Sequence, residues 1–581
     1  MKRKKQRAMF VAFSSVLALT ATACGGGTTT ATSPSGGTGA ASAKGGTLYY
    51  LTHRSAEHLD PQRTYIGRDI ADEARLVYRT LTTFPVVGGK DSLKIVADMA
   101  TDTGTASDNG KTWKFTLKAG VKWQDGKDVT CADFQYGISR SFAVDTLTGG
   151  PNYAIQFLDI PSDAKGGSIY KGPFVKDAAG QAAFDKSITC AGSDITFHLK
   201  KSVGDFNYAV YLPAFAPYRK DQDQGDKSNF SVFSTGPYKL QAPWVKDKGG
   251  TFIRNTSWDA KTDTVRKALP DSIVFVEGLT NEVIAQRLIS DQGNDKFAVT
   301  DRQVPPAFQP QILSNAALKP RFENVDAPFV DYLNPNFKTL TNPLVRQALA
   351  VSTDKTGYIT ALGGVTSGRP AQTLISPSVL GYKAFNAFNA PDNGDPVAAA
   401  ALLKQAGVPL PYPIKFTYSG GTPTSEKYAA ALKAGWERNG NFKVTLNELT
   451  DTYYDVVQNP ANADKYDITW AGWGADWPSA STVIPPLFDS RVNISAASNG
   501  QDYGYYVNPA FNKKIDEAYA TTDLPKQFAM WGVLDEQLAK DVAYIPLAYE
   551  KFFFIWGSGV KGWIDNQAFA DYPELGSLGV K

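Results

Sequence analysis

The chain has 581 residues, of which 43% are hydrophobic, 20% charged and 12% aromatic, and these proportions exclude a fibrous or wholly disordered protein. It is longer than one hydrophobic core usually serves, so at least two lobes are expected. The 60 basic and 57 acidic side chains nearly balance, so the composition gives no indication of a nucleic-acid partner.

The N-terminus has the organisation of an export signal. A basic stretch at 2–7 precedes an apolar run at 9–23 that is too short to span a membrane comfortably. The run ends in Ala-Thr-Ala-Cys24-Gly, which resembles the lipobox of bacterial lipoproteins, whose cysteine is diacylated and becomes the first mature residue. We therefore expect a lipoprotein signal peptide at 1–23, a lipid such as palmitate on Cys24 and a flexible Gly/Ser/Thr tether at 24–45. The alternative is an ordinary secretory signal with a chance cysteine.

Removing this signal takes five basic side chains and leaves a net charge of about −2. No other hydrophobic run approaches a membrane-spanning length, so we expect attachment to the membrane by the lipid anchor alone. Two further cysteines remain, Cys131 and Cys190. In an exported protein such a pair indicates one disulfide bond, and two free buried thiols are the alternative.

In the first half of the chain, residues 46–51 are predicted to form a strand and residues 69–81 a helix with Asp69 as its N-cap. Residues 112–118 alternate between apolar and polar, the period of a half-buried strand. Thr130 is predicted to cap a helix whose apolar stripe is Phe134, Ile138 and Phe142, with Asp133 completing a capping box. A second alternating strand follows Cys190 at Ile195, Phe197 and Leu199, so a disulfide would join helix to sheet.

In the second half, helices and strands alternate, which indicates an α/β lobe. Cap residues followed by proline or by helix-forming residues mark the helix starts: Asn342-Pro343, Asp395-Pro396, Asn508-Pro509 and Asp523, with a further helix predicted at 424–438. Predicted strands are 414–418, 444–446, 468–470, 543–549 and 552–556.

Four motifs occur in one order along the chain. They are Leu59-Asp60-Pro61; Leu117 to Gly126 with Val129 to Phe134 and Arg140; Ser234 to Tyr238; and Asn342 to Leu349. Together they resemble the signature of the extracellular solute-binding protein family 5, the peptide-type receptors of ABC importers. Gln124 and Cys131 differ from the residues that are most frequent in that pattern, but its hydrophobic frame is kept.

The resemblance implies a two-lobed periplasmic-binding-protein-like α/β fold of type II, belonging to the large cluster with an extra subdomain. Two crossovers, expected near 321–326 and 543–549, would join the lobes. The expected boundaries are 46–322 for lobe I with the extra subdomain, 323–545 for lobe II and 546–581 for the return to lobe I.

A stretch rich in tryptophan, Trp470 to Ser479, is the candidate binding site. Indoles give broad, stiff contact faces and lower the local dielectric constant, so an ion pair made by Asp476 would be stronger there than in open water. The run Trp473-Gly-Ala-Asp476-Trp477-Pro matches a pattern that, in peptide-binding family members, supplies the aspartate for the peptide's α-ammonium group. Asp476, Trp473, Trp477 and Trp470 are therefore the candidate ligand-binding residues, and core packing of the indoles is the alternative.

The function implied is that of a receptor rather than an enzyme. It would be a monomer without cofactor or metal, lipid-anchored on the extracytoplasmic face of the cell membrane, that captures di- or oligopeptides and delivers them to an ABC permease. A same-family receptor for an oligosaccharide, a nickel complex or haem is one alternative, and a peptide-sensing receptor that feeds no importer is another. A secreted hydrolase is a third, but the chain has neither a Gly-x-Ser-x-Gly nor a His-Glu-x-x-His motif. Its three histidines, His53, His58 and His198, are not at metal-ligand spacing.

Overall fold

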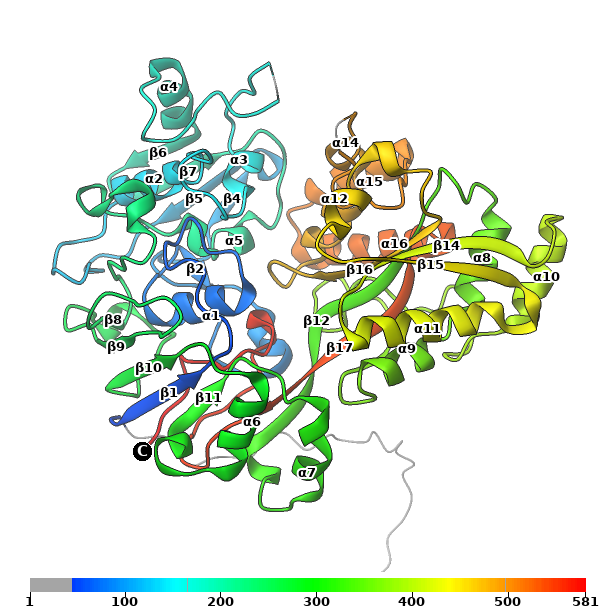
Figure 1. Cartoon of the computed structure of the whole chain (residues 1–581). Helices are drawn as coiled ribbons and strands as arrows, with labels where there is room; N and C mark the ends of the chain where they lie inside the picture. The colour runs from blue at the N-terminus through cyan, green and yellow to red at the C-terminus, as the bar shows by residue number, and fades with distance from the viewer. Residues whose placement is uncertain (1–43, 165, 497) are drawn as a thin grey trace, which may run out of the picture. The chain divides into compact units, whose positions relative to one another are not determined.

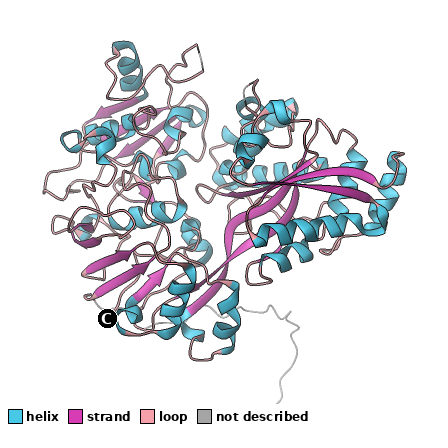
Figure 2. Cartoon of the chain, in the orientation of Figure 1, coloured by secondary structure: helices cyan, strands magenta, loops and turns pink. Residues whose placement is uncertain are grey.

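The structure is a computed structural model that describes residues 44–164, 166–496 and 498–581. The predicted signal peptide, Cys24 and nearly all of the predicted tether lie outside the described residues. Within the described part of the chain, no helix is both long enough and apolar enough to cross a bilayer. It contains both helices and strands, which Figure 2 distinguishes by colour.

The first sheet has the order β11-β1-β10-β9-β8. Its centre is β1 (Thr47–Leu51), which pairs in parallel with β10 (Ser272–Val276) and β11 (Ala298–Thr300). β9 (Thr251–Arg254) and β8 (Tyr238–Leu240) extend the sheet antiparallel to β10. The helices that follow or flank this sheet are α1 (Gly67–Leu76), α6 (Asn281–Ser290) and α7 (Gln309–Ser314), and the short strands β2 (Thr82–Thr83) and β3 (Val96–Ala97) pair beside α1. Helix α5 (Phe206–Ala209) lies elsewhere, where Phe206 packs against Trp113 and Phe197.

A four-stranded antiparallel sheet, β4-β5-β7-β6, is inserted into this first part of the chain. Trp113 and Phe115 of β5 and Ile195 and Phe197 of β7 point into its core, as their alternating pattern predicts. The elements are β4 (Thr105–Ser107), β5 (Thr112–Thr116), β6 (Ile188–Ala191) and β7 (Asp194–His198), with helices α2 (Cys131–Arg140), α3 (Tyr153–Phe157) and α4 (Ala178–Ser187).

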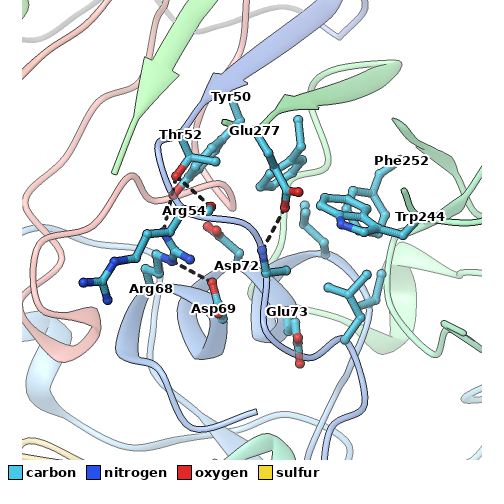
Figure 3. Close-up of a pocket in the computed structure, with 15 residues that line it drawn as sticks. Tyr50, Thr52, Arg54, Arg68, Asp69, Asp72, Glu73, Trp244, Phe252 and Glu277 are labelled. Carbon is cyan, nitrogen blue, oxygen red and sulfur yellow. Dashed lines mark hydrogen bonds and ion pairs between the residues drawn. The ribbon is translucent and has the colours of Figure 1, made fainter. Parts of the chain in front are cut away.

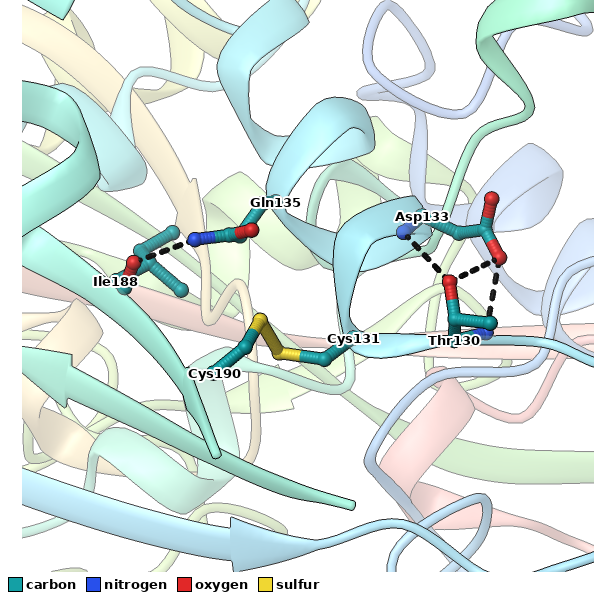
Figure 4. Close-up of a disulfide and its surroundings, with 6 residues drawn as sticks. All are labelled: Thr130, Cys131, Asp133, Gln135, Ile188 and Cys190. Atoms are coloured by element: carbon teal, nitrogen blue, oxygen red, sulfur yellow. Dashed lines mark hydrogen bonds between the residues drawn. A yellow bond between two sulfur atoms is a disulfide. The ribbon is translucent and has the colours of Figure 1, made fainter. Parts of the chain in front are cut away.

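The predicted disulfide is present in this insertion. Cys131, in the first turn of α2, is bonded to Cys190 on β6, with their Cα atoms 5.9 Å apart (Figure 4). Thr130 caps α2, and its side chain and that of Asp133 form the predicted capping box. The bond therefore joins helix to sheet across a sequence separation of 59 residues.

The second sheet has the order β13-β17-β12-β16-β14-β15 and mixes parallel and antiparallel pairs. Its strands are β12 (Phe322–Pro335), β13 (Gly368–Pro370), β14 (Tyr412–Ser419), β15 (Phe442–Leu449), β16 (Ile468–Gly474) and β17 (Ile545–Ile555). The helices are α8 (Pro343–Ser352), α9 (Lys355–Leu362), α10 (Pro396–Ala406), α11 (Pro423–Glu437), α12 (Tyr453–Val457), α13 (Ile484–Phe488), α14 (Ser490–Asn493), α15 (Pro509–Tyr519) and α16 (Leu524–Asp541). The helix starts at 343, 396, 509 and 524 are those predicted, and each is capped by the expected Asn or Asp side chain.

Below, lobe I means β1–β11 with α1–α7, and lobe II means β13–β16 with α8–α16. Two long strands connect them, because β12 and β17 pair antiparallel from Phe322 and Ile555 at one end to Leu333 and Ile545 at the other (Figure 1). The pairing is interrupted by a register shift between Asp326 and Val330. After β17 the chain returns to the first sheet, where Val580 packs in the same core as Leu48 of β1.

Two predicted elements have different limits. The helix expected at 69–81 runs from Gly67 to Leu76, and Asp69 lies inside its first turn, where it accepts a hydrogen bond from Arg68 Nε at 2.9 Å. The helix ends at Leu76 because the Val77 carbonyl accepts the backbone N–H groups of Thr235 and Gly236, both at 3.0 Å. The two strands expected at 543–556 are one continuous strand, β17, since residues 550 and 551 continue its pairing with β12 and β13.

Candidate functional site

Asp476 lies two residues after the end of β16, in a turn that local hydrogen bonds shape. Its backbone N–H donates to Thr482 Oγ1 at 3.2 Å, and Trp473 Nε1 donates to the Thr482 carbonyl at 2.8 Å. At Gly474, a Cβ atom would lie 2.2 Å from the ring of Phe329 on β12, so only glycine allows the two strands to approach this closely. These constraints hold the carboxylate of Asp476 at the end of the strand.

Three tyrosines of lobe I surround this residue. Asp476 Oδ2 accepts hydrogen bonds from the hydroxyls of Tyr65, at 2.9 Å, and Tyr153. The hydroxyl of Tyr211 donates to the backbone carbonyl of Asp476 at 2.7 Å. The residue therefore lies where lobe I and lobe II meet, and its carboxylate is held by neutral donors from the opposite lobe.

The carboxylate opens onto a cavity of about 190 Å³. Among the residues that the structure describes, Asp476 is the only charged side chain that lines it, and the walls include Tyr65, Tyr211, Phe329 and Phe569. Burial raises the pKa of Asp476 to about 6, and the hydrogen bonds from Tyr153 and Tyr65 lower it in part. At neutral pH the carboxylate is thus ionised and has no cationic partner in the described chain, which is the arrangement that a positively charged solute would complete.

The three candidate indoles lie around the site but do not line this cavity. Trp477 is 2% exposed, donates from Nε1 to Asp205 Oδ2 at 3.3 Å and packs edge-on against Tyr153. Trp473 is half-buried and bonded within its own turn. Trp470 points into a separate cavity. The walls that the sequence assigned to indoles are formed by tyrosine and phenylalanine, and the indoles' role as ligand contacts stays a prediction.

A second carboxylate, Asp205, anchors the segment after Asp476. It is fully buried and precedes α5 of lobe I, and its Oδ2 accepts from Trp477 Nε1, from Ser479 Oγ at 2.8 Å and from Ser481 Oγ at 2.5 Å. Burial raises the pKa of Asp205, and these three donors lower it. Asp205 therefore holds the 477–481 segment of lobe II against lobe I.

A further cavity in lobe I lies between β1, α1 and β10 (Figure 3). Its volume is about 30 Å³, and it is lined by acidic side chains that include Asp72, Glu73 and Glu277. Glu73 Oε2 and Trp244 Nε1 are buried without a hydrogen-bond partner in the described chain. This space suits about two ordered water molecules and is too small for a solute.

Arg369 lies on β13, where it makes an ion pair with Asp326 at 2.8 Å and stacks 4.5 Å from the centre of the Tyr549 ring, so it is not a free surface cation. The described residues contain no group of three or more His, Cys, Asp or Glu side chains that could hold a metal ion.

The architecture and the site define a class: a two-lobed α/β protein with a cavity where the lobes meet and a charged group at its wall. The model of the bacterial extracellular solute-binding proteins, family 5, matches residues 94–494, which is more than half of the chain. The protein belongs to this family, as its four motifs predicted. The family and the relatives named below are binding proteins.

Individual relatives agree over most of the chain. A solved structure of the clavulanic acid biosynthesis oligopeptide binding protein 2 is 27% identical, with a TM-score of 0.84, and the match covers 93% of this chain and 96% of that one. The periplasmic oligopeptide-binding protein OppA of Haemophilus influenzae is 26% identical over 75% of this chain and 77% of its own length. The probable deoxycholate-binding periplasmic protein YgiS of Escherichia coli is 24% identical over 86% and 87%. The predicted two-lobed fold is thereby confirmed.

Proposed function

We propose that the protein is a peptide receptor of an ABC importer, and that Asp476 receives the α-ammonium group of the peptide. The observation that carries this proposal is an ionised carboxylate on the wall of a cavity between the lobes, with no cation of the described chain to neutralise it. An ammonium group there would make a charge-assisted hydrogen bond, which contributes about 1.5–3 kcal/mol.

Binding of this kind couples to closure of the lobes. Tyr65 and Tyr153 come from lobe I and Asp476 from lobe II, so a solute at the carboxylate contacts both. A ligand that interacts with both lobes only when they are together stabilises that arrangement over any separated one. The backbone of an extended peptide can be held in the same way whatever its side chains, which suits a receptor for many peptides.

The proposal also includes export and lipid anchoring of the receptor, the limits of its lobes and its monomeric state. Residues 1–23 would be removed as a signal peptide, Cys24 would carry the lipid, and 24–45 would tether the receptor to the outer face of the cell membrane. The lobe limits are proposed at 322/323 and 545/546, with the two crossovers near 321–326 and 543–549. The receptor would act as a monomer that delivers peptide to a membrane permease.

Two measurements test the proposal. Native mass spectrometry of the purified protein identifies any solute that co-purifies, and calorimetry compares a peptide with a free N-terminus against its N-acetylated twin. We expect the free peptide to bind more tightly by a factor of ten or more. Equal affinity for the two peptides, or recovery of a solute without an amine, would contradict the proposal that Asp476 binds an α-ammonium group. Labelling with palmitate, lost in Cys24→Ala, tests the anchor.

A further inference from the structure

A second cavity between the lobes has a volume of about 520 Å³, which is within the range of ligand pockets. Lobe I lines it with the start of α6 and the segment 303–309, and lobe II lines it with α9, α11 and β16. Asp331 of β12 and Glu550 of β17 contribute from the two connecting strands. Its lining has no residue in common with that of the Asp476 cavity.

The charged side chains that line this cavity are all acidic. They are Glu282, Asp331 and Glu550, and no Lys, Arg or His of the described residues is among the lining. Asp331 is 5% exposed, and its Oδ1 has no hydrogen-bond donor in the described chain. The side chain of Glu550 has neither a hydrogen bond nor an ion pair there. Asp331 is therefore buried and Glu550 half-buried beside a solute-sized space, and neither has a compensating cation in the described chain, so a cationic ligand would neutralise them.

A hydrogen-bonded relay directs Asp331 into the cavity. Trp470 Nε1 donates to the hydroxyl of Tyr358 at 2.9 Å, and that hydroxyl donates to Asp331 Oδ2, also at 2.9 Å. Because the relay occupies Oδ2, the unpartnered Oδ1 is the acceptor left for a solute. Burial raises the pKa of both carboxyls, and the charge of Asp331 raises that of Glu550 further. A bound cation would reverse this shift and release protons.

Aromatic rings complete the lining. Trp470 and Tyr428 stack with their ring centres 6.0 Å apart and their planes at 24°, and Tyr358 lies beside them. Carboxylates combined with aromatic faces select ammonium or guanidinium groups, since the rings attract cations and cover their apolar stems. The described residues offer no metal-binding group, so the chemistry favours an organic cation.

The two cavities follow one another along the same strand. Phe329, on the wall of the first, and Asp331, on the wall of the second, are two residues apart on β12 and share a face. Asp331 is paired with Gly472, four residues before Asp476. At about 3.3 Å per extended residue, the backbone at these two acidic positions is separated along the strand by at most roughly 13 Å, since β16 ends at Gly474. An extended peptide with its N-terminus at Asp476 covers that distance with about three residues and one long side chain.

We propose that the Asp331–Glu550 cavity binds the basic side chain of the same solute, so that the preferred ligands are peptides with lysine or arginine shortly after a free N-terminus. This inference rests on the proposed function, because the first cationic group is the α-ammonium at Asp476. It narrows the ligand class from peptides in general to peptides carrying two positive charges.

The test compares tetra-alanine with its two variants that carry lysine at the second or third position, by calorimetry at pH 7.5. We expect one lysine peptide to bind at least tenfold more tightly than tetra-alanine in the wild type. Glu550→Gln and Asp331→Asn should remove that preference and leave the affinity for tetra-alanine unchanged. Glu517→Gln, the same substitution on the exposed face of α15, is the matched control and should retain the preference.

A readout of stability separates binding from folding. Neutralising one member of a buried acidic pair relieves repulsion, so Glu550→Gln without ligand should melt at the same temperature as the wild type or higher. A structural role would instead lower the melting temperature. If tetra-alanine binds and lysine adds nothing, or if Glu550→Gln keeps the preference, the inference is wrong and the proposed function stands. If no tetrapeptide binds but Nα-acetyl-lysine amide binds to the wild type and not to Glu550→Gln, the proposed function is wrong and the cation site stands. If neither binds, both are wrong.

Discussion

Replacing Asp476 by asparagine tests the proposed ammonium site with little change of shape. Asparagine keeps an oxygen that can accept from Tyr65 and Tyr153, but it removes the negative charge from the cavity. Because the pKa of Asp476 is about 6, nearly the whole charge is present at pH 7.5 and the substitution removes all of it. Loss of a charge-assisted hydrogen bond of about 1.5–3 kcal/mol corresponds to a decrease in affinity of roughly 10- to 150-fold.

The assay is calorimetry at pH 7.5 with a peptide that has a free N-terminus, run in parallel with the N-acetylated peptide. Asp476→Asn should weaken the first and leave the second unchanged, and the melting temperature without ligand should stay the same or rise, since a half-buried charge is removed. Asp145→Asn, on an exposed loop, controls for the change in net charge. Affinity within twofold of the wild type for the free peptide would refute the assignment.

Four further outcomes are expected. The affinity for a free-amine peptide should fall about tenfold between pH 8 and pH 5, because protonation of Asp476 below its pKa of about 6 abolishes the charge; a flat titration would contradict this. Tyr153→Phe removes a hydrogen bond that lowers the pKa of Asp476, so the midpoint of the same titration should move to higher pH. Replacing Cys131 and Cys190 together by serine should cost about 4 kcal/mol of unfolding free energy in urea, as the bridge closes a loop of about 60 residues. Burial raises the pKa of Glu73, so the folded protein is most stable while this carboxyl is protonated, and that contribution is lost as the pH rises. Glu73→Gln should therefore increase the free energy of unfolding more at pH 8 than at pH 5. A larger increase at pH 5 would exclude a buried protonated carboxyl at this position.

Local chemistry explains which elements the sequence predicts. The caps at Thr130, Asn342, Asp395 and Asn508 bond to backbone groups two or three residues away, so their signals are complete within a few positions. The end of α1 is different, because it is set by the 234–236 turn, far along the chain. Sequence alone therefore placed that helix end five residues too late.

The candidate site likewise combines residues that local sequence marks with partners that are brought together only by the fold. Asp476 is a candidate because of the indoles, glycines and proline beside it together with the family resemblance, and its role as a ligand contact stays a prediction. Its tyrosine partners are 411 and 323 residues away, and tyrosine is too common a residue to mark a contact at such distances. The pairing of Asp331 with Glu550 depends on two strands that meet only in the folded sheet. No local pattern distinguishes either carboxylate from an ordinary surface charge.

The register shift in β12 has a mechanical consequence. Residues 327–329 are not in register with β17, and Pro328 has no N–H to donate, so bending there breaks few ladder bonds. Pro328 and Phe329 also form part of the wall beside Asp476. A ligand that contacts this wall therefore contacts the irregular part of the two-stranded connection between the lobes, so its binding can be coupled directly to a change in their relative orientation.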